Sequence, residues 1–408
     1  MNILNEGYKN SKQLFLRGLG SKVYCKNNQE FIDITSAGGT SLLGHNNKIF
    51  KDSIKKFLNN NFSNFALPNE HANKLSKNLR KIFPQFSKFI FCNSGAEANM
   101  KAIRIARAVT KKDNIINVSG SWHGSIDQFL FTIDKNGKKK PLSSGLEKKI
   151  EKKIIYAPYN DFKKTKKIID KHKNKICCVM IEPIQGCLPT DKNMVYLSLL
   201  NEYCKKRKII LILDEIITGL RTDCSSVQNK YNLNSDISTF GKVFGNGLPI
   251  GFIGISKKIE KKIDRNKQKI FFGGTFSGNS FSTHLANETI KFLIKNKKKV
   301  FSNLEAKSKK FCEGIHKNIL KNNLNIKVVR FKSVIRIIFT NKNPQNRLQR
   351  DFLEKKNNLN KKNFVNFLRK NKIVFPSNGI IFMNTSILTS EIDYLIKIIS
   401  RGLIAYFK

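Results

Sequence analysis

The sequence predicts an α/β fold in which a mostly parallel sheet is covered by helices on both faces. Short runs rich in β-branched residues alternate with segments of helical pattern along most of the chain. Several of these runs end directly in polar residues, and ligands of such sheets sit at the carboxyl ends of the strands. With 408 residues the chain exceeds the usual size of one compact core, so we expect a large domain and a smaller one.

The predicted elements follow one another in a regular order. We expect strands at 88–92, 114–118, 177–183, 209–215, 236–241 and 251–256, and helices at 96–109, 196–206 and 390–404. Apolar segments such as IILIL (209–213) are far shorter than the roughly 20 residues that span a bilayer. The N-terminus MNILNEGYKNSKQ lacks the apolar core of a signal peptide. We therefore expect a cytoplasmic protein with no membrane partner.

The net charge of +47 is the feature that would favour a nucleic-acid partner, because clustered cations release counterions from phosphates. However, lysine far outnumbers arginine and accompanies abundant Asn, Ile and Phe, as expected from A- and T-rich codons. The basic runs at 163–175 and 295–299 are scattered and lack interleaved aromatic residues. We predict a solvated surface and no nucleic-acid partner; a basic nucleic-acid-binding protein is the alternative.

Eight cysteines are present, without a CxxC pair and without a Cys/His spacing suited to zinc. We predict neither a metal site nor a disulfide framework, and most of the thiols are expected in the core.

The segment FCNSGAEANM (91–100) places Asn93, Ser94 and Gly95 between a predicted strand and a predicted helix. The N-terminus of a helix leaves backbone N–H groups unpaired and carries a partial positive charge, so this turn suits a phosphate. An ordinary Ser N-cap with Glu97 in a capping box is the alternative.

Two further strand ends carry charged residues. Asp214 ends the apolar strand of IILILDE, where a carboxylate is costly to bury unless a cation or donors meet it. Lys242 follows the strand DISTFG and is the only lysine between Lys230 and Lys257. Its apolar, glycine-rich setting lowers the pKa of the amine, and the neutral amine can then attack a carbonyl carbon to form a Schiff base. A structural ion pair and a solvated lysine are the respective alternatives.

A phosphate turn, a strand-end Asp and a desolvated Lys, in that order on one sheet, match the three partners that pyridoxal phosphate needs. These are a site for its phosphate, an acceptor for its pyridinium nitrogen and an amine for its aldehyde. The sequence therefore predicts pyridoxal 5'-phosphate as the cofactor.

Six motifs in order resemble the class III pyridoxal-phosphate aminotransferases. They are NSGAEANMKAIRIAR (93–107), SWHG (121–124), IEPIQG (181–186), LDEIITGLR (213–221), TFGKVFGNGLPIG (239–251) and GTFSGN (274–279). The likeness begins near GSKVYCKNNQEFIDIT (20–35) and extends to the C-terminal region. It implies a fold type I transferase with a mostly parallel seven-stranded sheet, and a smaller α/β domain built from both chain ends. We expect residues 1–50 and 290–408 to form the small domain and 51–289 the large one.

The resemblance also implies a role for individual residues. Lys242 would form the Schiff base and move the proton, and Asp214 would keep the ring nitrogen protonated. The other cofactor-binding residues would be Ser94, Gly95, Ala96, Trp122 stacked on the ring, Glu182 and Thr275. In the family the threonine of GTFSGN reaches the phosphate of the neighbouring subunit, so a homodimer with shared sites is implied.

Within the family, the small-domain segments 328–340 and 374–387 are similar to those of the glutamate-1-semialdehyde aminomutase branch. Two departures matter. Cys187 stands where amine-acid transaminases usually have a Glu, and Ile380 stands where the mutases place a Glu after Pro-Ser. We therefore expect an intermolecular aminotransferase with an amino donor and a carbonyl acceptor; a semialdehyde aminomutase is the alternative. Arg336, inside the apolar run VIRIIF, is a candidate partner of a substrate carboxylate or a member of a structural ion pair.

Overall fold

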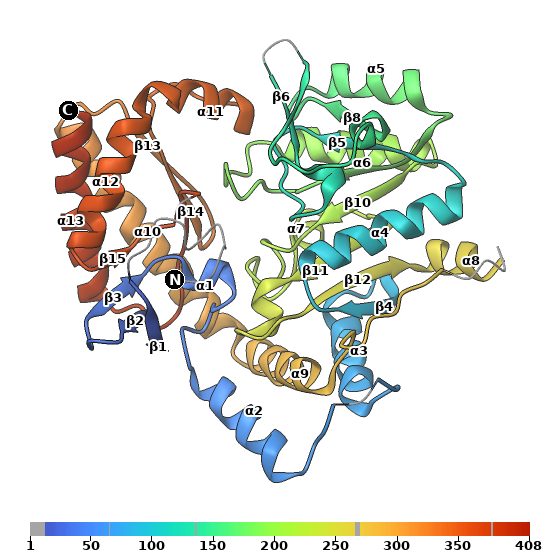
Figure 1. Ribbon diagram of the computed structural model, residues 1–408, viewed down its shortest axis with the longest axis horizontal. Coiled ribbons are helices and arrows are strands. Elements are labelled where there is room, and N and C mark those ends of the chain that lie inside the picture. Colours follow the sequence, from blue (N-terminus) through green and yellow to red (C-terminus); the bar gives the residue numbers. More distant parts are fainter. Residues whose placement is uncertain (1–12, 65, 135–136, 266–269, 377) are drawn as a thin grey trace.

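A computed structural model describes residues 13–408, except 65, 135, 136, 266–269 and 377. It has two lobes lying side by side (Figure 1). The large lobe is built on a seven-stranded sheet in the order β4-β12-β11-β10-β9-β5-β8. In chain order these strands are β4 Phe86–Cys92, β5 Asn114–Val118, β8 Ile154–Ala157, β9 Ile176–Ile181, β10 Ile210–Asp214, β11 Ile237–Gly241 and β12 Gly251–Ser256.

Within this sheet only β12 runs antiparallel to its neighbours, and the other adjacent pairs are parallel. The predicted α/β class with a mostly parallel seven-stranded sheet is thus confirmed. Every strand and helix expected from the sequence forms, with ends that differ by three residues at most. The strand β8, which the sequence did not indicate, completes the sheet.

Helices cover both faces of the sheet because alternate residues of each strand point to opposite sides. On one face, Val179 and Ile181 of β9 pack with helices α5 and α6; on the other, Cys178 and Met180 pack with α4 and α8. The helices of the large lobe are α2 Lys48–Asn59, α3 Glu70–Ile82, α4 Gly95–Thr110, α5 Phe162–His172, α6 Met194–Lys206, α7 Val227–Lys230, α8 Lys257–Arg265 and α9 Ser280–Lys295. The short elements are 3₁₀ helices η1 Asp127–Phe129, η2 Ile150–Lys153 and η3 Lys242–Gly245, and the hairpin β6 Phe131–Ile133 with β7 Lys139–Pro141.

Asparagine, aspartate and serine side chains begin most of these helices. Asn47, Ser94 and Asn279 each accept a hydrogen bond from the backbone N–H three residues later. Such caps satisfy one of the donors that the first turn leaves unpaired. Some of the many asparagines of this chain therefore have a structural role as helix caps.

The small lobe joins the N- and C-terminal segments of the chain. Strand β15 pairs in parallel with β3, so a C-terminal strand completes a sheet in the order β1-β2-β3-β15. A second sheet has the order β13-β14-β16. The strands are β1 Phe15–Leu19, β2 Lys22–Cys25, β3 Glu30–Asp33, β13 Lys327–Phe331, β14 Val334–Ile338, β15 Ile373–Val374 and β16 Ile380–Phe382. The helical elements are α1 Ser36–Gly39, α10 Lys297–Lys321, α11 Arg347–Glu354, η4 Lys355–Asn357, α12 Asn358–Lys370 and α13 Thr389–Phe407.

Helix α10 links the two lobes. Val300 and Leu304 pack in a core cluster of the large lobe, whereas Phe311 and Ile315 pack in the core of the small lobe. The boundary expected at 289–290 falls inside α9, and the first part of the expected segment 1–50 lies outside the described residues. The three-part division at 50 and 289 stays a prediction.

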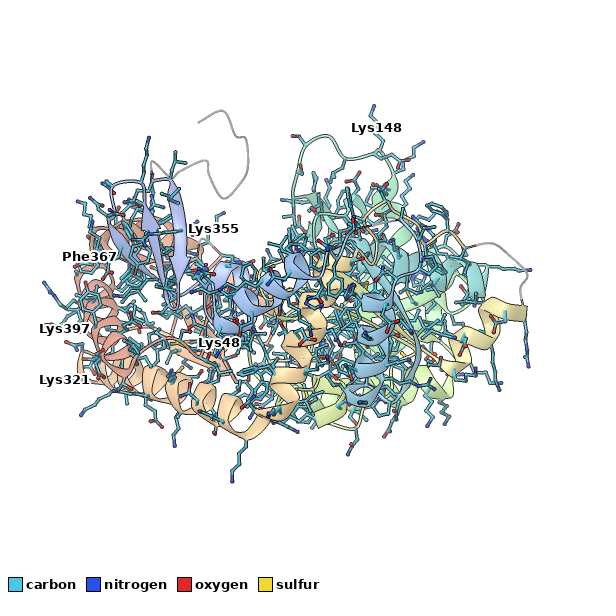
Figure 2. All side chains as sticks on the ribbon, turned by 90° about the horizontal axis from the view of Figure 1, so that it is seen from below. Lys48, Lys148, Lys321, Lys355, Phe367 and Lys397 are labelled. Carbon is cyan, nitrogen blue, oxygen red and sulfur yellow. The ribbon has the colours of Figure 1, made fainter. Side chains whose placement is uncertain are left out.

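Lysines are distributed around the molecule. Figure 2 shows Lys148 at the edge of one lobe and Lys321 and Lys397 at the edge of the other. Among the described helices, none combines the length and the apolar character that a membrane crossing needs. The absence of a nucleic-acid partner stays a prediction.

Candidate active site

Lys242 lies at the end of β11, where the chain turns sharply into η3. Its φ of 50° is in the left-handed region, which lysine seldom adopts. The preceding Gly241 leaves no room for a side chain, since a Cβ there would lie 3.1 Å from the carbonyl oxygen of Ile250. Val243 and Phe244, which follow, are buried. These neighbours fix the backbone and direct the lysine side chain into a cavity between the lobes.

Burial lowers the pKa of the Lys242 amine below its ordinary value, against the attraction of the Asp214 and Glu182 carboxylates, which raises it. A neutral amine is the form that can attack a carbonyl carbon. Because the desolvation effect is the larger one, the setting favours a reactive amine.

Asp214 ends β10 and is 3% exposed. Its Oδ2 accepts a hydrogen bond from Asn99 Nδ2 at 2.8 Å and lies 2.7 Å from His123 Nδ1, while Oδ1 accepts from the backbone N–H of Ile216 at 3.1 Å. Among the described residues no Lys or Arg lies within 4.0 Å of this carboxylate, and the neighbour that could pair with it as a cation is His123. One lone pair of Oδ1 remains for a further donor.

Asn99 and His123 extend this arrangement into a buried network. Asn99 Oδ1 accepts a hydrogen bond from Thr239 Oγ1 at 2.6 Å, and His123 Nε2 lies 3.2 Å from Asn117 Oδ1. The network joins α4, β5, β11 and the loop at 119–124 to the end of β10. No charge or strand end marks Asn99 in the sequence, but helical periodicity places it on the buried face of α4 and could have indicated it.

The turn at 93–96 forms the Ser N-cap that the sequence offered as the alternative to a phosphate site. Ser94 Oγ accepts from the backbone N–H of Glu97 at 3.1 Å, and the Glu97 carboxylate accepts from that of Asn93 at 3.1 Å. The cap does not use the N–H groups of Gly95 and Ala96, which have no acceptor inside the helix. Capping and anion binding are therefore compatible here.

Glycines bring the parts of the site close together. A Cβ on Gly95 would lie 2.5 Å from Ile216 Cδ1, and one on Gly124 would lie 2.9 Å from Ala96 Cβ. The first contact joins the helix terminus to the end of β10, and the second brings the SWHG loop over the same terminus. Gly124 also has a φ of +86°, which side chains rarely allow.

Trp122 and Glu182 line the cavity together with Lys242. The backbone N–H of Trp122 donates to Glu182 Oε2 at 2.8 Å, and that of Gly186 donates to Oε1 at 3.3 Å. Burial, with a smaller contribution from the Asp214 charge, raises the pKa of Glu182 to about 7. The indole is 45% exposed, so one of its faces is free to stack on a planar ring.

The cavity has a volume of about 480 Å³ and lies between the lobes. We call the large-lobe side its floor, formed by Lys242, Trp122 and Glu182 with Asp214 beneath them. The small-lobe side is its roof. The roof residues are Arg336, Arg347, Arg350, Pro376, Asn378, Ile380 and Phe382.

The roof contains three arginines, of which the sequence analysis singled out only Arg336. Arg347 and Arg350 come from α11, and no motif marks them in a chain with 76 Lys and Arg residues. Arg350 Nη1 donates to the carbonyl oxygen of Cys187, which also lines the cavity. Ile380 also lines the cavity, and Ser377, three residues before it, is outside the described residues.

Thr275 does not line this cavity. It is exposed in the segment between α8 and α9. Asn69 Nδ2 donates to the carbonyl oxygen of Gly278 at 2.8 Å, and Lys101 Nζ donates to Ser277 Oγ at 3.1 Å. The segment is thus held against α3 and α4, with the Thr275 side chain facing outward.

These residues fit a phosphorylated pyridine aldehyde. The turn at 94–96 offers backbone donors to a phosphate, Asp214 offers an acceptor to a protonated ring nitrogen, Trp122 offers a flat face and Lys242 offers an amine. Among the described residues, no three His, Cys, Asp or Glu side chains are grouped so as to hold a metal ion.

Residues 3–401 match the family model described as aminotransferase class-III. A glutamate-1-semialdehyde 2,1-aminomutase of Wigglesworthia glossinidia brevipalpis is 34% identical over 332 residues, which cover 80% of this chain and 75% of that protein.

Two solved structures share the fold. An omega-transaminase from Sphaerobacter thermophilus has a TM-score of 0.88 at 22% identity, over 97% of this chain and 91% of that one. A glutamate-1-semialdehyde-aminomutase variant from Pseudomonas aeruginosa PAO1 in complex with PMP has a TM-score of 0.86 at 16% identity, over 97% and 88%.

Proposed function

The chain belongs to the class III aminotransferases, and from this we propose that it transfers an amino group between two separate molecules. The donor is an amine or amino acid and the acceptor is an aldehyde or keto compound. When bound, pyridoxal 5'-phosphate supplies an aldehyde that takes up the amino group and a protonated ring that withdraws electrons from the reacting carbon.

The side chains of the floor have distinct roles in this proposal. Lys242 Nζ would hold the cofactor covalently and would carry the proton to and from the reacting carbon. Asp214 accepts the ring N–H, and the hydrogen bonds from Asn99 and His123 fix its orientation. Trp122 would stack on the ring, and Ser94, Gly95 and Ala96 would hold the phosphate. Glu182 orients the Trp122 loop by accepting its backbone N–H.

The residues of the roof favour transfer of the amino group between two molecules over transfer within one molecule. A mutase must retain a diamino intermediate until the amino group returns to the other carbon. The resemblance associates that retention with an acidic residue at the position that Ile380 occupies in this chain. Glu182 is the only acidic residue among the described residues that line the cavity, and it belongs to the floor. With no acid at the roof, the aminated product leaves and a second substrate must restore the cofactor. Ping-pong kinetics are the consequence.

The semialdehyde aminomutase is the second candidate, because the curated relative at 34% identity carries that name. A single experiment separates the two. Holoenzyme is supplied either with glutamate-1-semialdehyde alone or with paired amino donors and carbonyl acceptors. We expect turnover of the pairs; efficient, stoichiometric conversion of the semialdehyde alone to 5-aminolevulinate would establish the mutase instead.

We also infer a homodimer in which each site is completed by Thr275 of the other subunit. The support is its exposed position on a well-anchored segment, beside Phe271 and Phe276, which are 65% and 60% exposed. Large apolar side chains of this kind are usually covered by a partner when they cluster. A second copy of the chain would bury them and bring Thr275 to the phosphate end of its site.

A cytoplasmic location completes the proposal. The eight cysteines are all free, and all except Cys187 are buried. Thiols persist in this state in a reducing compartment.

A further inference from the structure

Arg221, the last residue of the motif LDEIITGLR, is one of the largest fully buried side chains and is 1% exposed. Among the described residues no carboxylate pairs with its guanidinium, and burial is the single cause that lowers the pKa of Arg221, to about 9. A buried cation without a counter-ion destabilises a protein unless its donors are satisfied. The hydrogen bonds of Arg221 therefore indicate what this residue does.

The loop that carries Arg221 is anchored next to the floor of the cavity. Glu215 follows Asp214 in the chain, and its buried carboxylate accepts hydrogen bonds from the backbone N–H groups of Val227 and Gln228, both at 2.9 Å. These bonds join the two ends of the loop. The backbone of Arg221 is thus held in a fixed position with respect to Asp214.

The guanidinium of Arg221 reaches from this loop into the small lobe. Nη1 donates to Ser333 Oγ at 2.8 Å and to the carbonyl oxygen of Met383 at 3.4 Å, and Nη2 donates to the carbonyl oxygen of Gly39 at 2.9 Å. The acceptors belong to the turn between β13 and β14, to the chain after β16 and to α1. One side chain of the large lobe therefore joins three separate segments of the small lobe, which the planar fork of a guanidinium can do.

The same guanidinium lies against a residue that lines the cavity. Arg221 Cζ is 4.8 Å from the ring centroid of Phe382, within the range of a cation–π contact. A Cβ on Gly39 would lie 3.0 Å from that ring, so α1 packs closely on its edge. Thr35, Gly38 and Phe382 line the cavity, and we call these three residues its side wall. Arg221 thus contacts both the ring of the side wall and the helix that carries its other two residues.

The backbone of α1 requires such support. Ser36 and Ala37 have φ values of 45° and 51°, in the left-handed region that these residues seldom adopt. Backbone of this kind persists only where its surroundings hold it in place. Ser36 Oγ donates to the carbonyl oxygen of Phe382 at 2.7 Å, and Arg221 holds the carbonyl oxygen of Gly39. The first bond comes from within the small lobe and the second comes from the large lobe.

We propose that Arg221 is a positioning residue for amino transfer, which fixes the side wall of Thr35, Gly38 and Phe382 at a set distance from Lys242. A substrate held between this wall and the floor then binds in one orientation. Without Arg221 the side wall is free to move and the substrate binds less tightly, whereas the cofactor keeps its partners on the floor. This inference rests on the proposed function, because it concerns how the same cavity is shaped for its substrates.

Hydrogen exchange measures this link in the holoenzyme without substrate. Arg221→Met is compared with the wild type and with Arg330→Met, a matched control, because Arg330 pairs with Glu305 at 2.8 Å within the small lobe. We expect the amides of 35–44 and 383–387 to exchange about tenfold faster or more in Arg221→Met alone, with β9 and β10 unchanged. Unchanged exchange in both segments would overturn the proposal. Faster exchange throughout the sheet would also contradict it, because Arg221 would then stabilise the large lobe as a whole.

A kinetic test separates the side wall from the floor. The same proteins are compared in their Kd for pyridoxal 5'-phosphate and in the reaction of the loaded enzyme with the amino donor that the wild type uses best. We expect the Kd of Arg221→Met to stay within about threefold of the wild type, and the half-saturating donor concentration to rise about tenfold or more, with a smaller change in the limiting rate. A general defect would weaken cofactor binding as well and would contradict the proposal.

Arg221→Lys is a second variant for both measurements, since one ammonium group cannot reach three separated acceptors at once. We expect changes in the same direction, and they decide the outcome where the methionine variant does not fold. If no donor reacts with any of the proteins, the proposed function fails while hydrogen exchange still shows whether Arg221 holds the side wall. Faster exchange with unchanged donor kinetics would keep the proposed function and reject the positioning role.

Discussion

Asp214 at the floor of the cavity and Glu354 at its roof are both buried carboxylates, 3% and 1% exposed, but they are used differently. Asp214 is surrounded by Asn99, His123 and a backbone N–H, all at hydrogen-bond distance. Glu354 faces three cations and pairs closely with none of the arginines. The floor is satisfied by the protein except for one acceptor position, whereas the roof has an excess of donors.

The difference follows from what each side binds. A cofactor has the same chemistry in every turnover, so its partners can be fixed by a closed network of short hydrogen bonds. A substrate must enter and leave, and its binding groups remain incompletely paired in its absence. Substitutions in the floor therefore test the cofactor assignment, and substitutions in the roof test how the substrate is bound.

The largest effect is expected at Lys242. Lys242→Ala removes the covalent link and the proton carrier, so kcat should fall by about 10⁴-fold or more, with the cofactor still bound non-covalently. Turnover and the visible absorbance of the bound cofactor measure the two outcomes. Lys257→Ala is the control, because the Lys257 side chain is 65% exposed.

Chemical labelling checks the same residue in the wild type. Borohydride should fix the cofactor to the chain irreversibly, and peptide mapping should locate it on Lys242. A label on another lysine would show that the burial of Lys242 has a structural purpose only.

The next largest effect is expected at Asp214. Asp214→Asn keeps the hydrogen-bond geometry approximately but removes the charge that stabilises a protonated ring nitrogen, and we expect a loss of about 10²- to 10³-fold in kcat. Cofactor affinity should fall as well. Asp113→Asn is a suitable control, since that side chain is 67% exposed. A variant that transaminates at nearly the wild-type rate would mean that the network of Asn99 and His123, and not the charge, is what the floor requires.

The floor and the roof of the cavity also differ in how far the sequence could predict them. Lys242, Asp214 and the turn at 94–96 follow strands of one sheet, and topology brings the ends of such strands together. The sheet, Lys242, Asp214 and the turn were therefore predictable from local pattern and spacing, whereas Trp122 and Glu182 were expected only from the family resemblance. Arg347 and Arg350 lie on a helix of the small lobe, and their approach to the cavity depends on how that lobe packs. Nothing in their sequence setting distinguishes them from the many surface cations.

A smaller effect, on the pH dependence of the free energy of unfolding, is expected from substitution of Glu182. Its pKa is raised to about 7 by burial, above the value of 4.5 expected for the unfolded chain. The folded state therefore retains a proton that the unfolded state releases, and stability falls as pH rises from about 4.5 to about 7. Glu182→Gln does not titrate. Its free energy of unfolding relative to wild type should improve by about 3 kcal/mol over that interval.

Denaturant unfolding of the cofactor-free proteins at pH 5 and pH 8 measures this difference, and any constant cost of the substitution cancels between the two pH values. Glu288→Gln is a control with a lowered carboxyl pKa, whose contribution to stability is already present at pH 5, so its difference should stay nearly constant between the two pH values. A Glu182→Gln difference that does not change with pH would indicate that Glu182 is ionised in the folded protein at pH 5.

The smallest expected signal is the recovery of activity in mixed dimers, and it tests whether the floor is completed within one chain. Lys242→Ala is inactive through its own site, and Thr275→Trp is inactive if Thr275 serves the site of its partner. In a heterodimer of the two, one site combines the intact Lys242 of one chain with the intact Thr275 of the other, and the second site carries both defects. Activity should therefore return to at most half of the wild-type value per dimer. Refolded mixtures, separated by two affinity tags, provide verified heterodimers for the assay. If such heterodimers stay inactive while wild-type chains treated in the same way recover, Thr275 acts within its own chain. The floor would then be as self-contained as the hydrogen bonds around Asp214.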